Sequence, residues 1–90
     1  MMTVLASNAE LYRYLATLEA ELRAHGPPDV VVALFHAARC APGPRREFLL
    51  ESRVALRVVL WRARGMLTEG RRDELIEVLR QLDAALANRP

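Results

Sequence analysis

Residues 52–61 read SRVALRVVLW, and this stretch decides how we expect the chain to fold. Only Ser52, Arg53 and Arg57 are polar here, so apolar side chains would cover most of the circumference of a helix. An ordinary amphipathic surface helix has an apolar stripe only a little wider than 100°. A helix with this sequence needs neighbours on several sides, and we predict that it is the central helix of the fold.

The flanking sequence sets the limits of this helix and indicates three others. Pro42-Gly43-Pro44 and Gly65 bound a helix over residues 44–64. Helices over residues 8–25 and 69–87 are predicted by Leu residues spaced 4, 3 and 4 apart, which give each helix a narrow apolar seam. The seam residues are Leu11, Leu15, Leu18 and Leu22 in the first helix and Leu75, Leu79, Leu82 and Leu86 in the last.

The segment Val30–Phe35 could by itself be a strand, but we predict a helix over residues 28–40. Ala37 and Ala38 continue the segment, and the chain has no second strand candidate to pair with it. Ser7 and Glu10 form a capping-box pattern at the start of the first helix, and Thr68 is the expected cap of the last.

The chain has 90 residues, of which 52% are hydrophobic, enough for one small core and a single domain over residues 1–90. Loops of two to four residues between the predicted helices imply antiparallel neighbours. The predicted fold is therefore all-α, either a four-helix antiparallel bundle or two stacked helical hairpins. Residues 65–86 faintly resemble the second helix of a tetratricopeptide repeat, with Gly70 at the turn, although Leu75 and Leu82 stand where that family has small residues and no 34-residue period exists. The resemblance implies hairpin stacking only.

All 13 basic residues are Arg. We interpret this as the codon usage of a GC-rich, bacterial genome. Residues 30–67 carry seven Arg against two Glu, whereas the flanking segments are slightly acidic. A basic middle segment can attract an acidic partner, but the acidic flanks can also neutralise it after folding.

Four Arg residues form a row on the predicted central helix. Their spacing of 7, 4 and 7 places them within about 40° of one another at 100° per residue. They are Arg46, Arg53, Arg57 and Arg64. Arg53 and Arg57 are spaced i, i+4 and repel each other unless an anionic group pairs with them. That anion can be another helix of the chain, an acidic protein partner or a phosphate, and the sequence leaves the three open.

The sequence contains no motif that indicates catalysis, a metal or another cofactor. His36 and Cys40 share a helical face, but two ligands do not make a zinc site. Glu47 and Glu51 lie in the first turns of their helix, where acids complement the helix dipole. Nucleophilic triads and phosphate-binding Gly loops are lacking. We therefore expect neither an enzyme nor a bound cofactor.

An apolar central helix in a chain too short to surround it predicts that another molecule covers part of it. We expect a protein-protein interaction module, an adaptor, chaperone or regulatory subunit, that forms a homodimer or binds a larger protein. Its expected contacts are Trp61, Tyr12, Tyr14 and the Arg row, because aromatic and Arg side chains dominate interface energetics. The alternative is a small nucleic-acid-associated regulator with the Arg row on phosphates.

A cytoplasmic location is expected, with no membrane association. A single cysteine, Cys40, gives no disulfide framework. No apolar run approaches the roughly 18 residues of a membrane span. Residues 1–9 lack the basic and apolar regions of a secretory signal.

Overall fold

The computed structural model describes residues 7–87, which form four helices joined by short turns. They are α1 (Asn8–Arg23), α2 (Pro28–Arg39), α3 (Arg45–Arg62) and α4 (Glu69–Ala87), with a 3-10 turn, η2 (Arg64–Met66), before α4. The predicted all-α helical bundle is confirmed. Residues 1–6, on which the expectation of no secretory signal partly rests, lie outside the described part of the chain.

α3 ends two residues earlier than expected. Ala63 leaves the helical conformation, with φ −119° and ψ 18°, although its N–H still bonds to the carbonyl of Val59. Ala63 is itself buried, so the chain turns here to bring α4 back along α3. Arg64 consequently lies in η2 and does not continue the helical row of Arg46, Arg53 and Arg57.

Local sequence explains where the helices begin. The Ser7 hydroxyl accepts a hydrogen bond from the Glu10 N–H at 3.2 Å, and the Thr68 hydroxyl accepts one from the Arg71 N–H at 3.1 Å. Each cap satisfies a backbone donor that the first turn of a helix leaves free. Gly26 permits the tight turn after α1, because a Cβ there would lie 2.8 Å from the carbonyl oxygen of Leu22.

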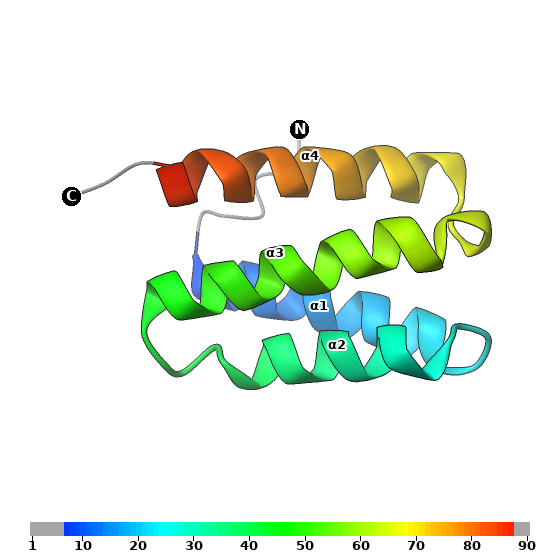
Figure 1. Ribbon diagram of the computed structural model, residues 1–90, viewed down its shortest axis with the longest axis horizontal. Helices are drawn as coiled ribbons and strands as arrows, with labels where there is room; N and C mark the ends of the chain where they lie inside the picture. The colour runs from blue at the N-terminus through cyan, green and yellow to red at the C-terminus, as the bar shows by residue number, and fades with distance from the viewer. Residues whose placement is uncertain (1–6, 88–90) are drawn as a thin grey trace.

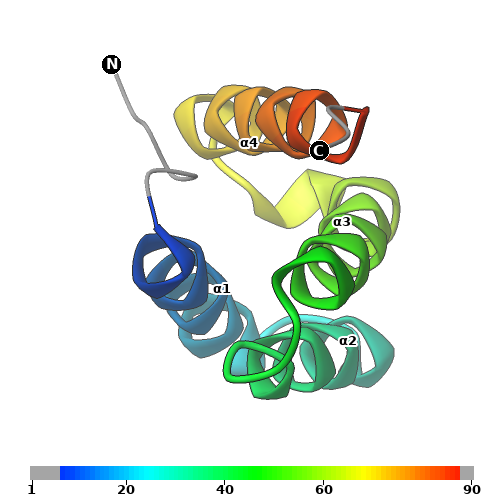
Figure 2. The same ribbon diagram turned by 90° about the vertical axis from the view of Figure 1, so that its left-hand side faces the viewer.

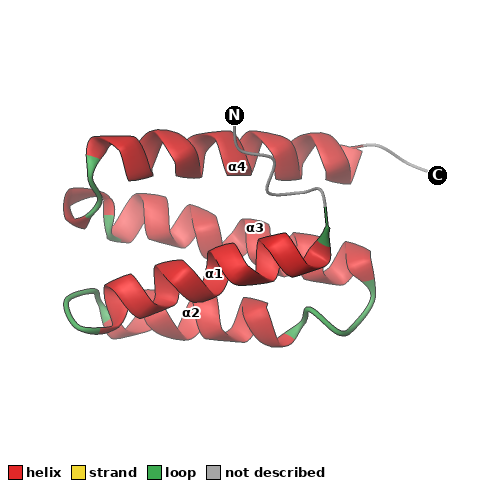
Figure 3. Ribbon diagram, turned by 180° about the vertical axis from the view of Figure 1, so that it is seen from behind, coloured by secondary structure: helices red, strands yellow, loops and turns green. Residues whose placement is uncertain are grey.

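Each helix packs against the next one along the chain: α1 on α2, α2 on α3 and α3 on α4. Figure 1 shows α3 between α4 and α2, with α1 behind them, and Figure 3 shows α1 from the other side. In the end view of Figure 2, the four helices form an open curve whose two ends are α1 and α4. The ion pair between Arg71 and Glu21 joins these two ends.

The core lies on the inner side of this curve. All eight seam Leu residues predicted on the first and last helices are buried. From α3 the core receives one side of the helix only: Phe48, Leu49, Ser52, Ala55, Leu56 and Val59. α2 and α4 cover the two flanks of α3, and its remaining face points away from the core (Figure 2). Within residues 7–87, none of the helices combines the length and apolarity needed to cross a membrane.

Candidate interaction surface

A row of apolar side chains runs along the outer face of α3. Leu50, Val54, Val58 and Trp61 are spaced 4, 4 and 3 apart, which places them on one side of a helix, opposite the buried Phe48 and Val59. Val54 is 57% exposed and Trp61 is 82% exposed, while Leu50 and Val58 are half-buried. We call these four residues the α3 ridge. The helix that carries the ridge lies in front of α1 in Figure 1 and on the opposite side of the molecule from α1 in Figure 2.

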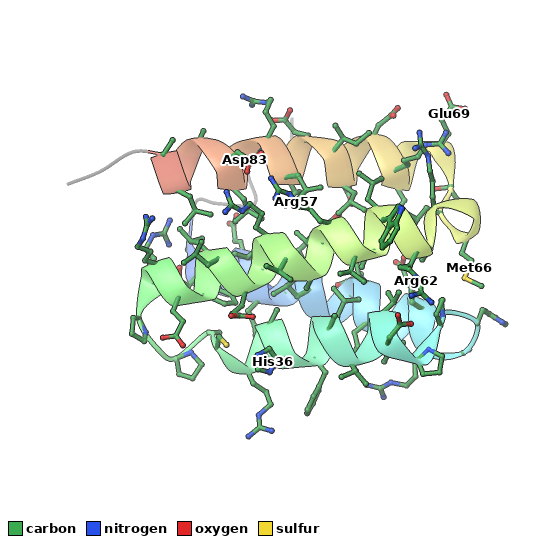
Figure 4. The ribbon with its side chains drawn as sticks, viewed as in Figure 1. His36, Arg57, Arg62, Met66, Glu69 and Asp83 are labelled. Atoms are coloured by element: carbon green, nitrogen blue, oxygen red, sulfur yellow. The ribbon has the colours of Figure 1, made fainter. Side chains whose placement is uncertain are left out.

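Charged pairs border the ridge on the side of α4. Asp83 lies 3.1 Å from Arg53 and 3.4 Å from Arg57, measured between its Oδ1 and the guanidinium nitrogens. Figure 4 shows Arg57 and Asp83 pointing toward one another between the two helices. The repulsion between Arg53 and Arg57 on α3 is thus compensated by the carboxylate of Asp83 in the same chain.

An ion pair and a His–Glu contact border the ridge on the side of α2. Arg62 Nη1 lies 2.9 Å from Asp29 Oδ2, and His36 Nε2 lies 3.6 Å from Glu51 Oε1. The ridge therefore has an apolar centre between two charged margins. Protein interfaces have this arrangement, with a fully covered apolar centre and a polar rim.

Ile76 adds an apolar side chain next to the ridge. It lies seven residues, about two helical turns, before Asp83 on α4 and is 47% exposed. Because α4 runs antiparallel to α3, two turns before Asp83 corresponds to two turns beyond Arg53 and Arg57, the level of Trp61. The position of Ile76 beside α3 depends on the register between the two helices, which local sequence does not determine.

The four Arg residues of the predicted row do not share one environment. Arg53 and Arg57 contact Asp83, and Arg46 donates a hydrogen bond of 3.3 Å to the carbonyl of Leu86. These three lie along the boundary with α4. Arg64 is exposed in η2 and has no ion-pair partner among residues 7–87.

Tyr12 and Tyr14 lie on opposite flanks of α1, away from the α3 ridge. Tyr14 is buried toward α4, where burial first and the Glu74 carboxylate second raise the pKa of its phenol above the ordinary value. Its hydroxyl has no hydrogen-bond partner within the described residues. A tyrosine held in this way belongs to the interior and presents little surface to a partner.

Tyr12 instead lines a shallow groove of about 320 Å³ on the outside of α1 and α2. The groove also contains Phe35, which is 50% exposed and carries the Arg39 guanidinium 5.7 Å from its ring centroid. Phe35 was not among the predicted contact residues, although an aromatic and an Arg residue spaced i, i+4 are a visible signal in the sequence. α1 lies on the far side of the molecule from the outer face of α3 (Figure 2), so Tyr12 and Trp61 do not form one patch.

The side chains of His36 and Cys40 do not contact one another in a shared site. The Cys40 thiol donates to the carbonyl of His36, with a sulfur-to-oxygen distance of 3.5 Å, while the His36 ring faces Glu51. Over the part of the chain that the structure describes, no three His, Cys, Asp or Glu side chains gather in a way that could hold a metal ion.

No protein-family model, curated protein or solved structure matches this chain. The assignment of the α3 ridge as a contact surface is therefore based on its exposure and its charged margins.

Proposed function

We propose that the protein is a self-associating protein-protein interaction module, of the adaptor, chaperone or regulatory-subunit kind, and that the α3 ridge is its contact surface. The observation that carries this proposal is the 82% exposure of Trp61 in one row with the exposed Val54. Trp, with Tyr and Arg, is enriched among the side chains that dominate binding energy at interfaces.

The free energy of hydration supports this assignment. A Trp side chain has roughly 150–250 Å² of surface, and burying apolar surface is worth about 25 cal/mol per Å². At 82% exposure, Trp61 alone leaves on the order of 3–5 kcal/mol of burial free energy unused in the single subunit. A partner surface that covers the ridge would recover part of this free energy.

The shape of the surface favours a protein as the occupant. Small ligands bind in concave pockets that enclose most of their surface. The ridge projects from the outer side of a helix, between the charged pairs Arg57–Asp83 and Arg62–Asp29. A projecting apolar row with charged margins suits another protein surface that has a matching groove or ridge.

Sedimentation velocity across the micromolar range tests the proposal. We expect the wild-type protein to sediment as a species larger than one subunit and to dissociate on dilution. Val54→Glu should shift the protein to the single subunit, because it places a charge in the middle of the ridge. Phe35→Glu is the matched control, since Phe35 is similarly exposed but lies in the α1/α2 groove.

These measurements distinguish a failure of self-association from a wrongly assigned contact surface. A wild-type protein that remains a single subunit at the highest concentrations removes the basis for self-association. If both variants dissociate the protein equally, the contact surface is not the ridge. Circular dichroism of each variant checks that the helices are retained.

A further inference from the structure

The α3 ridge is nearly symmetric about its own midpoint. The midpoint between Leu50 and Trp61 and the midpoint between Val54 and Val58 both fall within half a residue of position 56. If a second α3 runs antiparallel across the first, with a two-fold axis at this level, Leu50 faces Trp61 of the other copy and Val54 faces Val58. Each apolar residue of the ridge then meets another apolar residue.

The charges at the two ends of the ridge have the same symmetry. Glu47 lies one turn before Leu50, and Arg64 lies three residues after Trp61, so their midpoint also falls within half a residue of position 56. Both side chains are exposed, and neither has an ion-pair partner among the described residues. Antiparallel pairing brings Glu47 of each copy toward Arg64 of the other, at both ends of the contact.

Parallel pairing would have the opposite electrostatic result. It places Glu47 against Glu47 at one end and Arg64 against Arg64 at the other. Like charges placed directly across an interface are strongly unfavourable. The charge pattern therefore selects the antiparallel arrangement.

The ridge lies on the broadest face of the molecule. The molecule measures 39 × 25 × 19 Å along its principal axes, and Figure 1 looks down the shortest of them onto α2, α3 and α4. Specific interfaces bury roughly 800 Å² per partner, so the contact must extend from the ridge onto the neighbouring parts of α2 and α4 on this face. A two-fold contact is also the commonest form of self-association, because it uses the same patch on both copies.

We propose that the partner on the α3 ridge is a second copy of this chain, packed antiparallel about a two-fold axis near Leu56, with Glu47 of each copy paired to Arg64 of the other. This inference rests on the proposed function and adds to it the orientation and register of the contact.

Reversing the two end charges, one at a time and together, tests the register. Glu47→Arg and Arg64→Glu should each weaken the dimer by roughly tenfold or more at low salt, since each turns two attractive pairs into two repulsive ones. The double variant, with both changes in one chain, should recover the wild-type dissociation constant. It restores both pairs with their signs exchanged and keeps the net charge of +2. Within one subunit Glu47 lies in the first turn of α3 and Arg64 follows its last turn, with about 22 Å of helix between Glu47 and Arg62, so the recovery cannot arise inside a single copy.

Sedimentation equilibrium at low and high salt provides the measurement. If both single variants dimerise like the wild type while Val54→Glu still dissociates the protein, the antiparallel register is wrong and the proposed contact surface stands. If the single variants are weakened but the double variant is not restored, the pairing of Glu47 with Arg64 is likewise wrong. If the wild type never dimerises, the proposed function fails together with this inference. High salt should reduce the difference between the variants, because exposed ion pairs are screened.

Discussion

Trp61→Ala offers the most direct measure of what the α3 ridge contributes. Trp61 is 82% exposed in the single subunit, so its removal takes few contacts away from the folded chain. Surface substitutions of this kind change the free energy of unfolding by about 0.5 kcal/mol or less. The dimer should respond far more strongly, because both copies lose a side chain from the contact.

The smallest expected effect follows from the energies that Trp side chains contribute at other protein interfaces. Taking the lower end of the range for an interface Trp, each side chain contributes about 2 kcal/mol, and the two in a symmetric dimer contribute about 4 kcal/mol. Each 1.4 kcal/mol corresponds to a tenfold change, so the dissociation constant should rise by nearly a thousandfold. The full burial of two Trp side chains would give a still larger change.

Tyr12→Ala is the matched control for this experiment. Tyr12 is an aromatic residue with 47% exposure, but it lies in the groove between α1 and α2. Sedimentation equilibrium would give the dissociation constants, and urea denaturation of the dilute protein would give the stability of the subunit. A rise below tenfold for Trp61→Ala, or an equal rise for Tyr12→Ala, would refute the reasoning from exposed area.

Three further predictions concern the subunit itself. Ser52→Ala should raise the free energy of unfolding, measured by urea denaturation, by about 1 kcal/mol. The fully buried Ser52 hydroxyl has no hydrogen-bond partner within residues 7–87, and Ala is the better helix former. A loss of stability would show that the hydroxyl is hydrogen-bonded. In a Tyr12→Phe background, tyrosinate absorbance should show that the buried Tyr14 stays protonated at pH 10.0, its ordinary pKa, because burial raises its pKa in the folded state. Because the pKa of Tyr14 is higher in the folded state, the protonated phenol contributes fully to the free energy of unfolding below its unfolded-state pKa, and this contribution is lost as the pH rises through its folded-state pKa. Half-titration of Tyr14 in the native protein at pH 10.0 would contradict this prediction. Asp83→Ala should lower the free energy of unfolding by about 0.5–1 kcal/mol at low salt and by less at high salt. It removes two exposed ion pairs and leaves the like charges of Arg53 and Arg57 one helical turn apart. A loss of stability that does not depend on salt would indicate that Asp83 acts through packing instead.

Sequence patterns were sufficient to predict the four helices because the signals were local. Leu seams, Pro and Gly at the turns, and the caps Ser7 and Thr68 act within a few residues of the elements they define. The end of α3 was predicted two residues late, because nothing local stops a helix at Arg62. The turn at Ala63 depends on the burial of that residue against the rest of the fold.

The candidate surface could be predicted only in part. Composition indicated that α3 is apolar nearly all around, but it could not say which side would be left uncovered. That depends on how α2 and α4 pack, which buries Phe48 and leaves Val54 and Trp61 outside. The partner of the Arg row was equally non-local, because Asp83 reaches Arg53 and Arg57 only through the register of α4 on α3.

The order of the helices in space is also their order in the sequence, and this has a consequence for how the chain folds. Each close packing joins neighbours across a short turn, so little chain entropy is lost when the helices meet. Proteins dominated by such local pairings fold in microseconds to milliseconds. Since α4 packs mainly on α3, at one end of the open curve (Figure 2), its amide hydrogens should exchange with solvent through opening events that leave the other three helices folded.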